Sequence, residues 1–339
     1  MPPMRLLFRL PLILCAASAL FAAKPLEIYF IDVEGGQATL IVTPNKQSML
    51  VDAGWPGFNK RDALRITKVA KHAGVKDVDY LLMTHFHVDH AGGIPQLVEQ
   101  MPVKSFVDHG TNIEKGKSAD ELSANYAKAL ATGNHIVAKA GDKIPLKGLD
   151  VTVVESNGDA IASALPGAGA PNPFCASAPK FPADPSENAR SVGFVLQYGK
   201  FRFVDLGDLT AAKEVELVCP NNKVGTVDLY LTTHHGLDQS NAKAIVDALH
   251  PRVAVMNNGA KKGGSPPAWQ TVKDSPGLED MWQVHYSFAG GKEHNVAEPM
   301  IANLEEQCEG NYIRVSANPD GSMIVYNSRN KFEKTYPAK

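Results

Sequence analysis

The sequence has few cysteines, few aromatic residues and no excess of either charge. Its 339 residues include four cysteines, and aromatic side chains make up 7% of the chain. So few cysteines exclude a small scaffold held together by disulfides. The 34 basic and 36 acidic side chains give a formal net charge of −2. This balance lacks the basic excess of a general nucleic-acid-binding protein.

Long apolar stretches are also absent. After residue 23, no segment approaches the roughly 18 apolar residues of a membrane-spanning helix. At the start, Arg5 and Arg9 precede an apolar run over 10–21, followed by small residues suited to cleavage. This pattern predicts a signal peptide over 1–23, without fixing the cleavage site, and export to the periplasm or the cell exterior. Its removal takes away two arginines and no acids, leaving a net charge of −4.

Three cysteines follow the predicted signal peptide: Cys175, Cys219 and Cys308. An oxidising compartment would allow one disulfide among them, and the sequence leaves the pairing open.

The most informative stretch runs from Asp79 to Gly93. A short apolar run, 80–83, has the length of a buried strand and leads into His85-Phe86-His87-Val88-Asp89-His90 and two glycines. Alternate residues of an extended chain point the same way, so His85 and His87 can grip one ion together. Asp89 and His90 can hold a second ion if the chain turns into a helix there. Imidazole and carboxylate ligands suit zinc, and also manganese or iron, better than calcium or magnesium.

The rest of the chain alternates strands and helices in two halves of similar rhythm. Strands are expected at 26–33, 38–43, 48–52, 80–83, 104–107, 150–155, 191–198, 200–204, 227–233, 253–256, 313–316 and 323–326. Helices are expected at 60–73, 94–100, 118–132, 211–218 and 241–249, with further helical segments near Leu278 and at 298–307. The Gly-, Ala- and Pro-rich stretch 156–189 is predicted to be a loop insertion near the site mouth. This order favours an α/β protein with two sheets between outer helices. A single domain over 24–339 is predicted, with a C-terminal extension, 261–339, whose packing is left open.

Polar side chains that suit metals follow several predicted strands. They are Asp52, the His85–His90 cluster, His109, Asp208 and His235. If these strand ends meet, a binuclear site follows: His85, His87 and His109 on the first ion, Asp89, His90 and His235 on the second, with Asp208 as the bridge. Water shared by two such ions would be a hydroxide source near neutral pH, which is the chemistry of hydrolysis.

The segment Thr84 to Gly93 resembles the signature motif of the metallo-β-lactamase-fold superfamily. Asp52 in Val-Asp-Ala-Gly, Gly207-Asp208 and His235-Gly236 resemble its other motifs. The amino-acid sequences of segments 30–38, 201–208 and 234–236 resemble those of soluble relatives of the hydrolase domain of ComEC-type DNA-uptake proteins. The resemblance covers about residues 26–260. It implies an αββα sandwich of two mixed sheets and a centre of two divalent ions, with zinc expected first.

The resemblance also ranks rival positions. It favours Asp208 over Asp205 for the bridge and His235 over His234 for the last ligand. His234 would then lie behind the metal ligands or face the substrate, and Asp52 would support the ligand loop.

By this resemblance the chain is expected to be an exported metal-dependent hydrolase that uses metal-bound hydroxide, with Asp89 holding the nucleophile in line. Phosphodiesters or other small esters are the expected substrates. A β-lactamase or lactonase is the alternative, although an aspartate stands where zinc β-lactamases place cysteine or histidine. A non-catalytic metal-binding protein of the same fold is the remaining reading. The multi-pass membrane channel of ComEC proteins has no counterpart here, so DNA uptake is not implied. Oligomeric state is left open.

Overall fold

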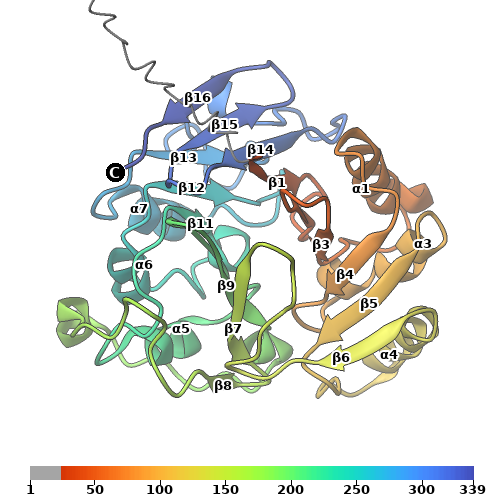
Figure 1. The fold of residues 1–339 in the computed structure, drawn as a ribbon, viewed down its shortest axis with the longest axis horizontal. Coiled ribbons are helices and arrows are strands. Elements are labelled where there is room, and N and C mark those ends of the chain that lie inside the picture. Colours follow the sequence, from red (N-terminus) through yellow and green to blue (C-terminus); the bar gives the residue numbers. More distant parts are fainter. Residues whose placement is uncertain (1–23) are drawn as a thin grey trace, which may run out of the picture.

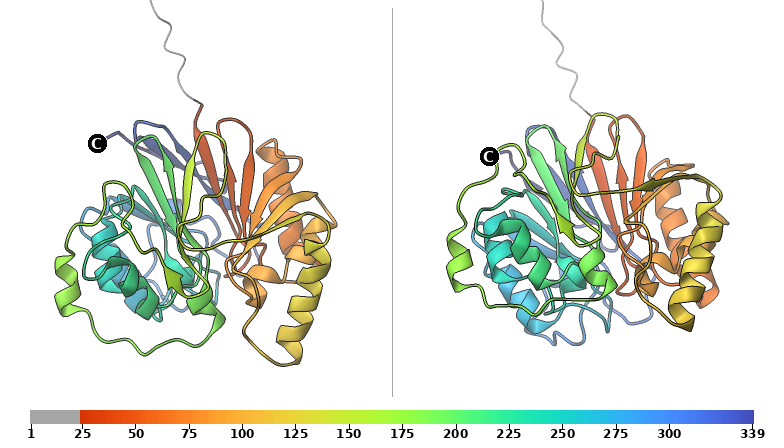
Figure 2. Two further views of the ribbon diagram at one scale, coloured as in Figure 1. Left: turned by 60° about the horizontal axis from the view of Figure 1, so that its bottom comes forward. Right: turned by 90° about the horizontal axis from the view of Figure 1, so that it is seen from below.

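The chain forms two facing β-sheets with helices on both outer sides (Figures 1 and 2). The computed structural model describes residues 24–339, so the predicted signal peptide lies outside the described residues. This arrangement confirms the predicted αββα sandwich of two mixed sheets.

The first sheet has nine strands in the order β16-β15-β14-β1-β2-β3-β4-β5-β6. They are β1 (Leu26–Ile31), β2 (Thr39–Val42), β3 (Ser48–Val51), β4 (Val78–Leu82), β5 (Val103–Asp108), β6 (Asn134–Val137), β14 (Tyr312–Ala317), β15 (Met323–Asn327) and β16 (Glu333–Tyr336). Neighbours from β3 to β6 are parallel, and the others are antiparallel. Because β3, β4 and β5 run parallel to one another, their carboxyl ends lie at the same edge of the sheet.

The second sheet has seven strands in the order β13-β12-β11-β10-β9-β7-β8. They are β7 (Asp150–Ser156), β8 (Asp159–Ala160), β9 (Gly193–Tyr198), β10 (Phe201–Asp205), β11 (Leu229–Leu231), β12 (Val253–Met256) and β13 (Asp280–Gln283). Strands β10 to β13 are parallel, and β8-β7-β9-β10 are antiparallel. This sheet therefore also gathers the carboxyl ends of several strands at one edge.

Three apolar clusters hold the layers together. The largest joins the inner faces of both sheets, where the rings of Phe30 and Phe203 lie 5.9 Å apart. A second packs the first sheet against its helices: α1 (Arg61–His72), α2 (Val88–Ala91), α3 (Ile94–Val98) and α4 (Lys117–Leu130). A third packs the second sheet against α5 (Ala211–Val218), α6 (Lys243–Leu249) and α7 (Pro266–Lys273). Helix α1 buries Ala63, Ile66, Val69 and Ala70, the face that its spacing predicts.

The C-terminal residues 261–339 contribute to both sheets. Strand β13 extends the second sheet beside β12, and β14 pairs with β1 in the first sheet. The helix expected over 298–307 is wrong: only the short 3₁₀ helix Glu298–Met300 forms. Its carbonyls are taken by tertiary contacts, since Arg329 donates to the carbonyls of Glu298 and Ile301. The helix expected near Leu278 is also wrong, because α7 ends at Lys273.

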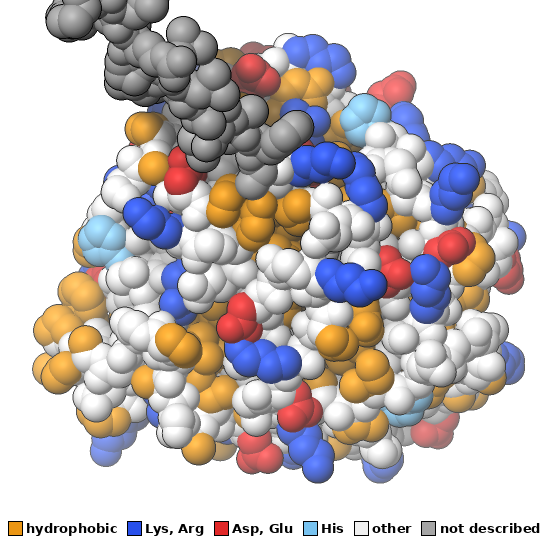
Figure 3. All heavy atoms as spheres, in the orientation of Figure 1, with side chains coloured by type: hydrophobic (Ala, Val, Ile, Leu, Met, Phe, Trp, Pro, Cys, Tyr) orange, Lys and Arg blue, Asp and Glu red, His pale blue; other side chains and the backbone are white. Residues whose placement is uncertain are grey.

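The surface carries charges of both signs. On the face in Figure 3, basic and acidic side chains are interspersed. Across residues 24–339, none of the helices combines the length and apolar character needed to cross a membrane.

Strand β7 buries Glu155 completely, and neither of its carboxyl oxygens has a hydrogen-bond partner among the described residues. Burial raises its pKa from 4.5 to about 8. The folded state therefore binds one more proton than the unfolded state between these values, and stability falls as the pH rises through this window. We expect Glu155→Gln to remove this loss. From pH 5 to pH 9 the wild type should lose on the order of 3 kcal/mol more unfolding free energy than the variant, measured by urea titration. If the unfolding free energies of the wild type and of Glu155→Gln changed with pH in parallel, this prediction would be contradicted.

Candidate metal centre

The predicted ligands meet where the carboxyl edges of the two sheets face each other. Asp52 follows β3, the His85–His90 segment follows β4, and His109 follows β5. From the second sheet, Asp208 follows β10 and His235 follows β11. The backbone is locally strained here, because Asp52, His234 and His235 all have φ between 55° and 58°. Such left-handed conformations in residues other than glycine are typical of functional sites.

One group of four buried side chains converges around the carboxylates of Asp89 and Asp208. Asp89 Oδ2 lies 3.2 Å from His90 Nε2 and 3.3 Å from His235 Nε2. Asp208 reaches the same two nitrogens at 3.2 and 3.3 Å. The two Nε2 atoms are 3.2 Å apart, which suits two lone pairs directed at one ion. The group matches the set predicted for the second ion, joined by Asp208.

A second group consists of His85, His87 and Asp208, whose ligand atoms lie within 4.8 Å of one another. His85 Nε2 is buried without a hydrogen-bond partner and lies 3.9 Å from Asp208 Oδ2. His87 Nε2 lies 2.9 Å from the carboxylate of Glu114, which leaves Nδ1 as its free ligand atom. Asp208 is thus the side chain that both groups share, as expected of a bridge.

Asp52 fixes the orientation of the ligand loop. Its carboxylate accepts hydrogen bonds from the backbone N–H and the hydroxyl of Thr84, both at 2.7 Å. It also lies 2.7 Å from His90 Nδ1. The Thr84 hydroxyl, having donated its proton, is left to accept from His85 Nδ1 at 3.0 Å. Asp52 therefore sets the tautomer that leaves Nε2 of both histidines free for an ion.

The electrostatics also suit cations. Burial alone would raise the pKa of Asp208, but the imidazoles of His235, His90 and His234 hold it well below its usual range. The pKa of Asp89 is also held well below its usual range, against the effect of burial, chiefly by the charge of His90. Two buried carboxylates therefore stay ionised and need positive charge beside them.

The pKa values of His90 and His85 shift in opposite directions. Burial works to lower the pKa of His90, but Asp208, Asp89 and Asp52 raise it well above its usual value. Burial and the neighbouring charge on His90 lower the pKa of His85 well below its usual value. Orphaned ligand atoms, converging lone pairs and ionised carboxylates fit a pair of divalent ions.

His109 is placed apart from both groups. Its Nε2 lies 2.8 Å from the carboxylate of Glu187, and both side chains are buried. Glu187 also accepts hydrogen bonds from the backbone N–H groups of Phe86 and Ile113. Burial works to raise the pKa of Glu187, but these three hydrogen bonds outweigh it and lower the pKa. A metal-binding role for His109 therefore stays a prediction.

Glu187 and Glu114 are two site residues that sequence reasoning missed. Glu187 ends the loop insertion and fastens the backbone between His85 and His87. Glu114 reaches His87 from the segment before α4. Each is an ordinary-looking acid in a polar stretch, so the sequence carries no signal for either contact.

The two rival residues occupy distinct positions. His234 Nε2 lies 3.3 Å from Asp208 Oδ2, yet His234 belongs to neither ligand group. Burial lowers its pKa to about 4, so it is neutral at pH 7. Asp205 instead accepts hydrogen bonds from Gln37 and from the backbone N–H of Gly207. Burial raises its pKa to about 7.

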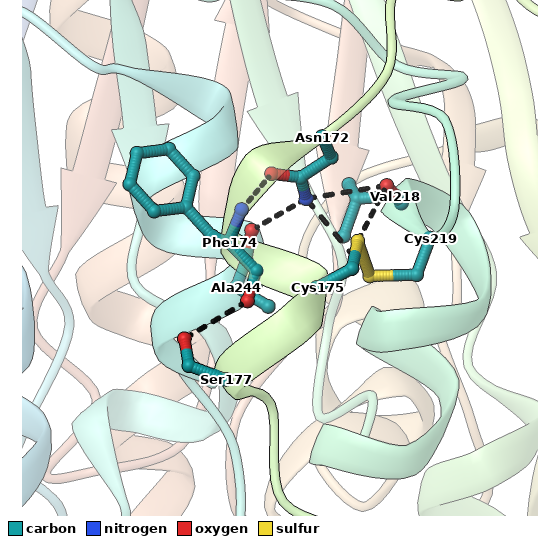
Figure 4. The surroundings of a disulfide bond; sticks show 7 residues. All are labelled: Asn172, Phe174, Cys175, Ser177, Val218, Cys219 and Ala244. Atoms are coloured by element: carbon teal, nitrogen blue, oxygen red, sulfur yellow. Dashed lines mark hydrogen bonds between the residues drawn. A yellow bond between two sulfur atoms is a disulfide. The ribbon is translucent and has the colours of Figure 1, made fainter.

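The loop insertion is tied to α5 beyond Asp208. A disulfide joins Cys175 to Cys219, and Cys308 is the free cysteine of the described chain. Beside this bond, Asn172 donates hydrogen bonds to the carbonyls of Val218 and Ala244 (Figure 4). The loop then crosses the lower edge of the molecule from one layer toward the other (Figure 2).

Between this loop and the segments that follow Asp208 and His235 lies a cleft of about 430 Å³. Its lining includes Phe181, Pro182, Pro185, Thr210, Asp238 and Gln239.

Comparison with known proteins agrees with this geometry. Residues 31–170 match the family described as the metallo-beta-lactamase superfamily. Over these residues the chain is similar to that superfamily, and its two-sheet sandwich is consistent with the fold. It is also 24% identical over 250 residues to ComE operon protein 3 of Bacillus subtilis (strain 168), covering 69% of this chain. The aligned part spans 28% of that protein's length. Both findings confirm the resemblance drawn from the sequence motifs.

Two solved structures are similar at low identity, the first of them described as a metallo-beta-lactamase fold protein. YhfI from Bacillus subtilis is 12% identical, with a TM-score of 0.46 over 77% of this chain and 96% of YhfI. The diiron β-hydroxylase CmlA from Streptomyces venezuelae is 16% identical, with a TM-score of 0.40 over 76% of this chain and 48% of CmlA. Members of the superfamily are typically metal-dependent hydrolases, and this chain carries a His/Asp cluster suited to that role.

Proposed function

We propose that this protein is an exported hydrolase that uses two divalent metal ions to cleave phosphodiesters or other small esters. The observation that carries the proposal is the position of Asp208. It is shared by two groups of buried ligands, one with His85 and His87 and the other with Asp89, His90 and His235. Such sharing of one carboxylate would let these residues hold two divalent ions side by side, as binuclear hydrolytic sites do.

When bound, a pair of divalent ions lowers the pKa of a coordinated water and polarises the substrate oxygen. Zinc suits the imidazole-rich donor set, and manganese or iron are alternatives. Among the chain's own residues, Asp89 is placed to orient the attacking water, and neutral, buried His234 faces the Asp208 carboxylate. In hydrolysis, water adds to phosphorus or the carbonyl carbon, the bond to the leaving oxygen breaks, and that oxygen takes the proton.

The proposal of export rests on the predicted signal peptide and on the disulfide between Cys175 and Cys219. Disulfides of this kind form and persist in oxidising compartments, such as the periplasm and the cell exterior.

The test is hydrolysis of bis(p-nitrophenyl) phosphate by residues 24–339 loaded with zinc or manganese. We expect turnover that a chelator abolishes and that added metal restores. The same preparation should be assayed with a β-lactam, a lactone and a carboxylic ester. Turnover confined to those compounds would reject phosphodiesters and favour the β-lactamase or lactonase alternative. Two bound ions without any turnover would favour the non-catalytic reading.

A further inference from the structure

Lys262 lies at the entrance of the candidate metal centre, outside the segments that carry the family resemblance. It belongs to the loop between β12 and α7, and its ammonium contacts Asp89 Oδ2. The same oxygen lies 3.2 and 3.3 Å from the Nε2 atoms of His90 and His235. The Lys262 side chain is 30% exposed, whereas that of Asp89 is 7% exposed. The ammonium therefore stands between the buried ligands and solvent.

The loop is built to hold Lys262 there. The carbonyl of Lys262 accepts a hydrogen bond from the backbone N–H of Gly259 at 2.8 Å, and the Lys262 ammonium lies 5.3 Å from the centre of the Trp55 ring. A Cβ on Gly35 would come within 2.8 Å of Lys262 Cβ, and one on Gly263 within 2.2 Å of the His235 carbonyl. Side chains larger than glycine would push the loop away from the site at both contacts.

The neighbouring Lys261 provides the contrast. Its ammonium pairs with Glu306, and the two side chains are 71% and 55% exposed. Such an exposed pair contributes little energy and reaches no ligand of the metal centre. Two adjacent lysines thus have different surroundings, one on the open surface and the other against a buried carboxylate.

The charge balance indicates what Lys262 does when ions are present. If Asp89 held a divalent ion, its carboxylate charge would no longer be available to neutralise the ammonium. Lys262 would then add a positive charge beside the ions, at the solvent side of the site. Such a cluster favours an anion, and a lysine ammonium offers three donors to phosphate oxygens.

We propose that Lys262 binds a non-reacting anionic oxygen of the substrate's phosphate group and thereby selects anionic phosphate esters over neutral esters. This inference rests on the proposed function, and it makes Lys262 a substrate-binding residue of that site.

The experiment compares Lys262→Met and Lys262→Arg with the control Lys261→Met. For bis(p-nitrophenyl) phosphate, K262M should raise KM at least about tenfold, since a hydrogen bond to a charged group is lost. Bound metal should stay at two ions per chain, and KM for neutral p-nitrophenyl acetate should stay within about twofold of the wild-type value. K262R should recover most of the affinity, and K261M should match the wild type.

A titration with inorganic phosphate separates this inference from the proposed function, because it needs no turnover. By calorimetry on the metal-loaded proteins, K262M should bind phosphate at least about tenfold more weakly than K261M. Equal phosphate affinities would overturn the inference even if the wild type hydrolyses phosphodiesters. Loss of a metal ion from K262M would also overturn the inference, because Lys262 would then be needed to hold the metal ligands in place.

Discussion

Substitution of Asp208 by alanine is expected to abolish binding of both metal ions and to lower hydrolysis roughly a thousandfold or more, because several kcal/mol of charge stabilisation depend on the ions. Asp208 is the carboxylate common to both ligand groups. Without it, His90, His234 and His235 lose the negative charge that faces all three. Metal content by plasma emission spectroscopy and turnover of the chromogenic phosphodiester measure the two effects.

Asp205 offers a matched control in the same turn, three residues earlier. It is equally buried, but it bonds Gln37 and the Gly207 backbone instead of the ligand cluster. Because burial raises its pKa to about 7, the amide of Asp205→Asn closely mimics its partly protonated native form. The D205N protein should keep both ions and most activity. Metal loss in D205N but not in D208A would reverse the assignment of the bridge.

Replacement of Asp52 by alanine is expected to weaken both folding and metal binding. It deletes three hydrogen bonds and strands the backbone N–H of Thr84 in the interior. Loss of one member of a buried charged network costs about 3–5 kcal/mol, which urea unfolding of the metal-free protein would show. Loss of the carboxylate behind a ligating histidine, His90, should also reduce metal affinity about 10–100-fold.

The conservative variant Asp52→Asn separates the two effects. Its oxygen can still accept from the Thr84 backbone, so most folding stability should return. Its NH₂ group cannot accept from His90 Nδ1, so metal affinity should stay reduced. If D52N bound metal as tightly as the wild type, Asp52 would have no part in fixing the His90 tautomer.

Much of this architecture follows from local sequence patterns. The helix predicted at 211–218 matches α5 residue for residue, and that at 60–73 differs from α1 by one residue at each end. Both have apolar spacing that fits one buried face. The ligand cluster after β4 was recognisable because four potential metal ligands, three histidines and one aspartate, lie within six residues.

Contacts between distant segments could not be predicted in this way. Glu187 meets His109 across 78 residues, and Lys262 meets Asp89 across 173. Which cysteines pair also depends on where the loop insertion lies, since Cys175 reaches Cys219 only once that loop packs against α5. In sequence, a lysine or glutamate in a polar loop has the same surroundings whether its side chain lies in solvent or in a buried site. Only the fold determines which of the two it occupies.

Each candidate ion draws its ligands from both sheets. His85, His87, Asp89 and His90 follow β4 of the first sheet, whereas Asp208 and His235 follow β10 and β11 of the second. Neither half of the chain alone contains a complete ligand group, so tight ion binding requires the two halves to have docked. By linkage, ions that bind only the docked state stabilise it by RT ln(1 + [ion]/Kd), which is about 4 kcal/mol at a thousandfold excess over Kd. Resistance to proteolysis should therefore depend on the metal supply of the compartment in which the protein works.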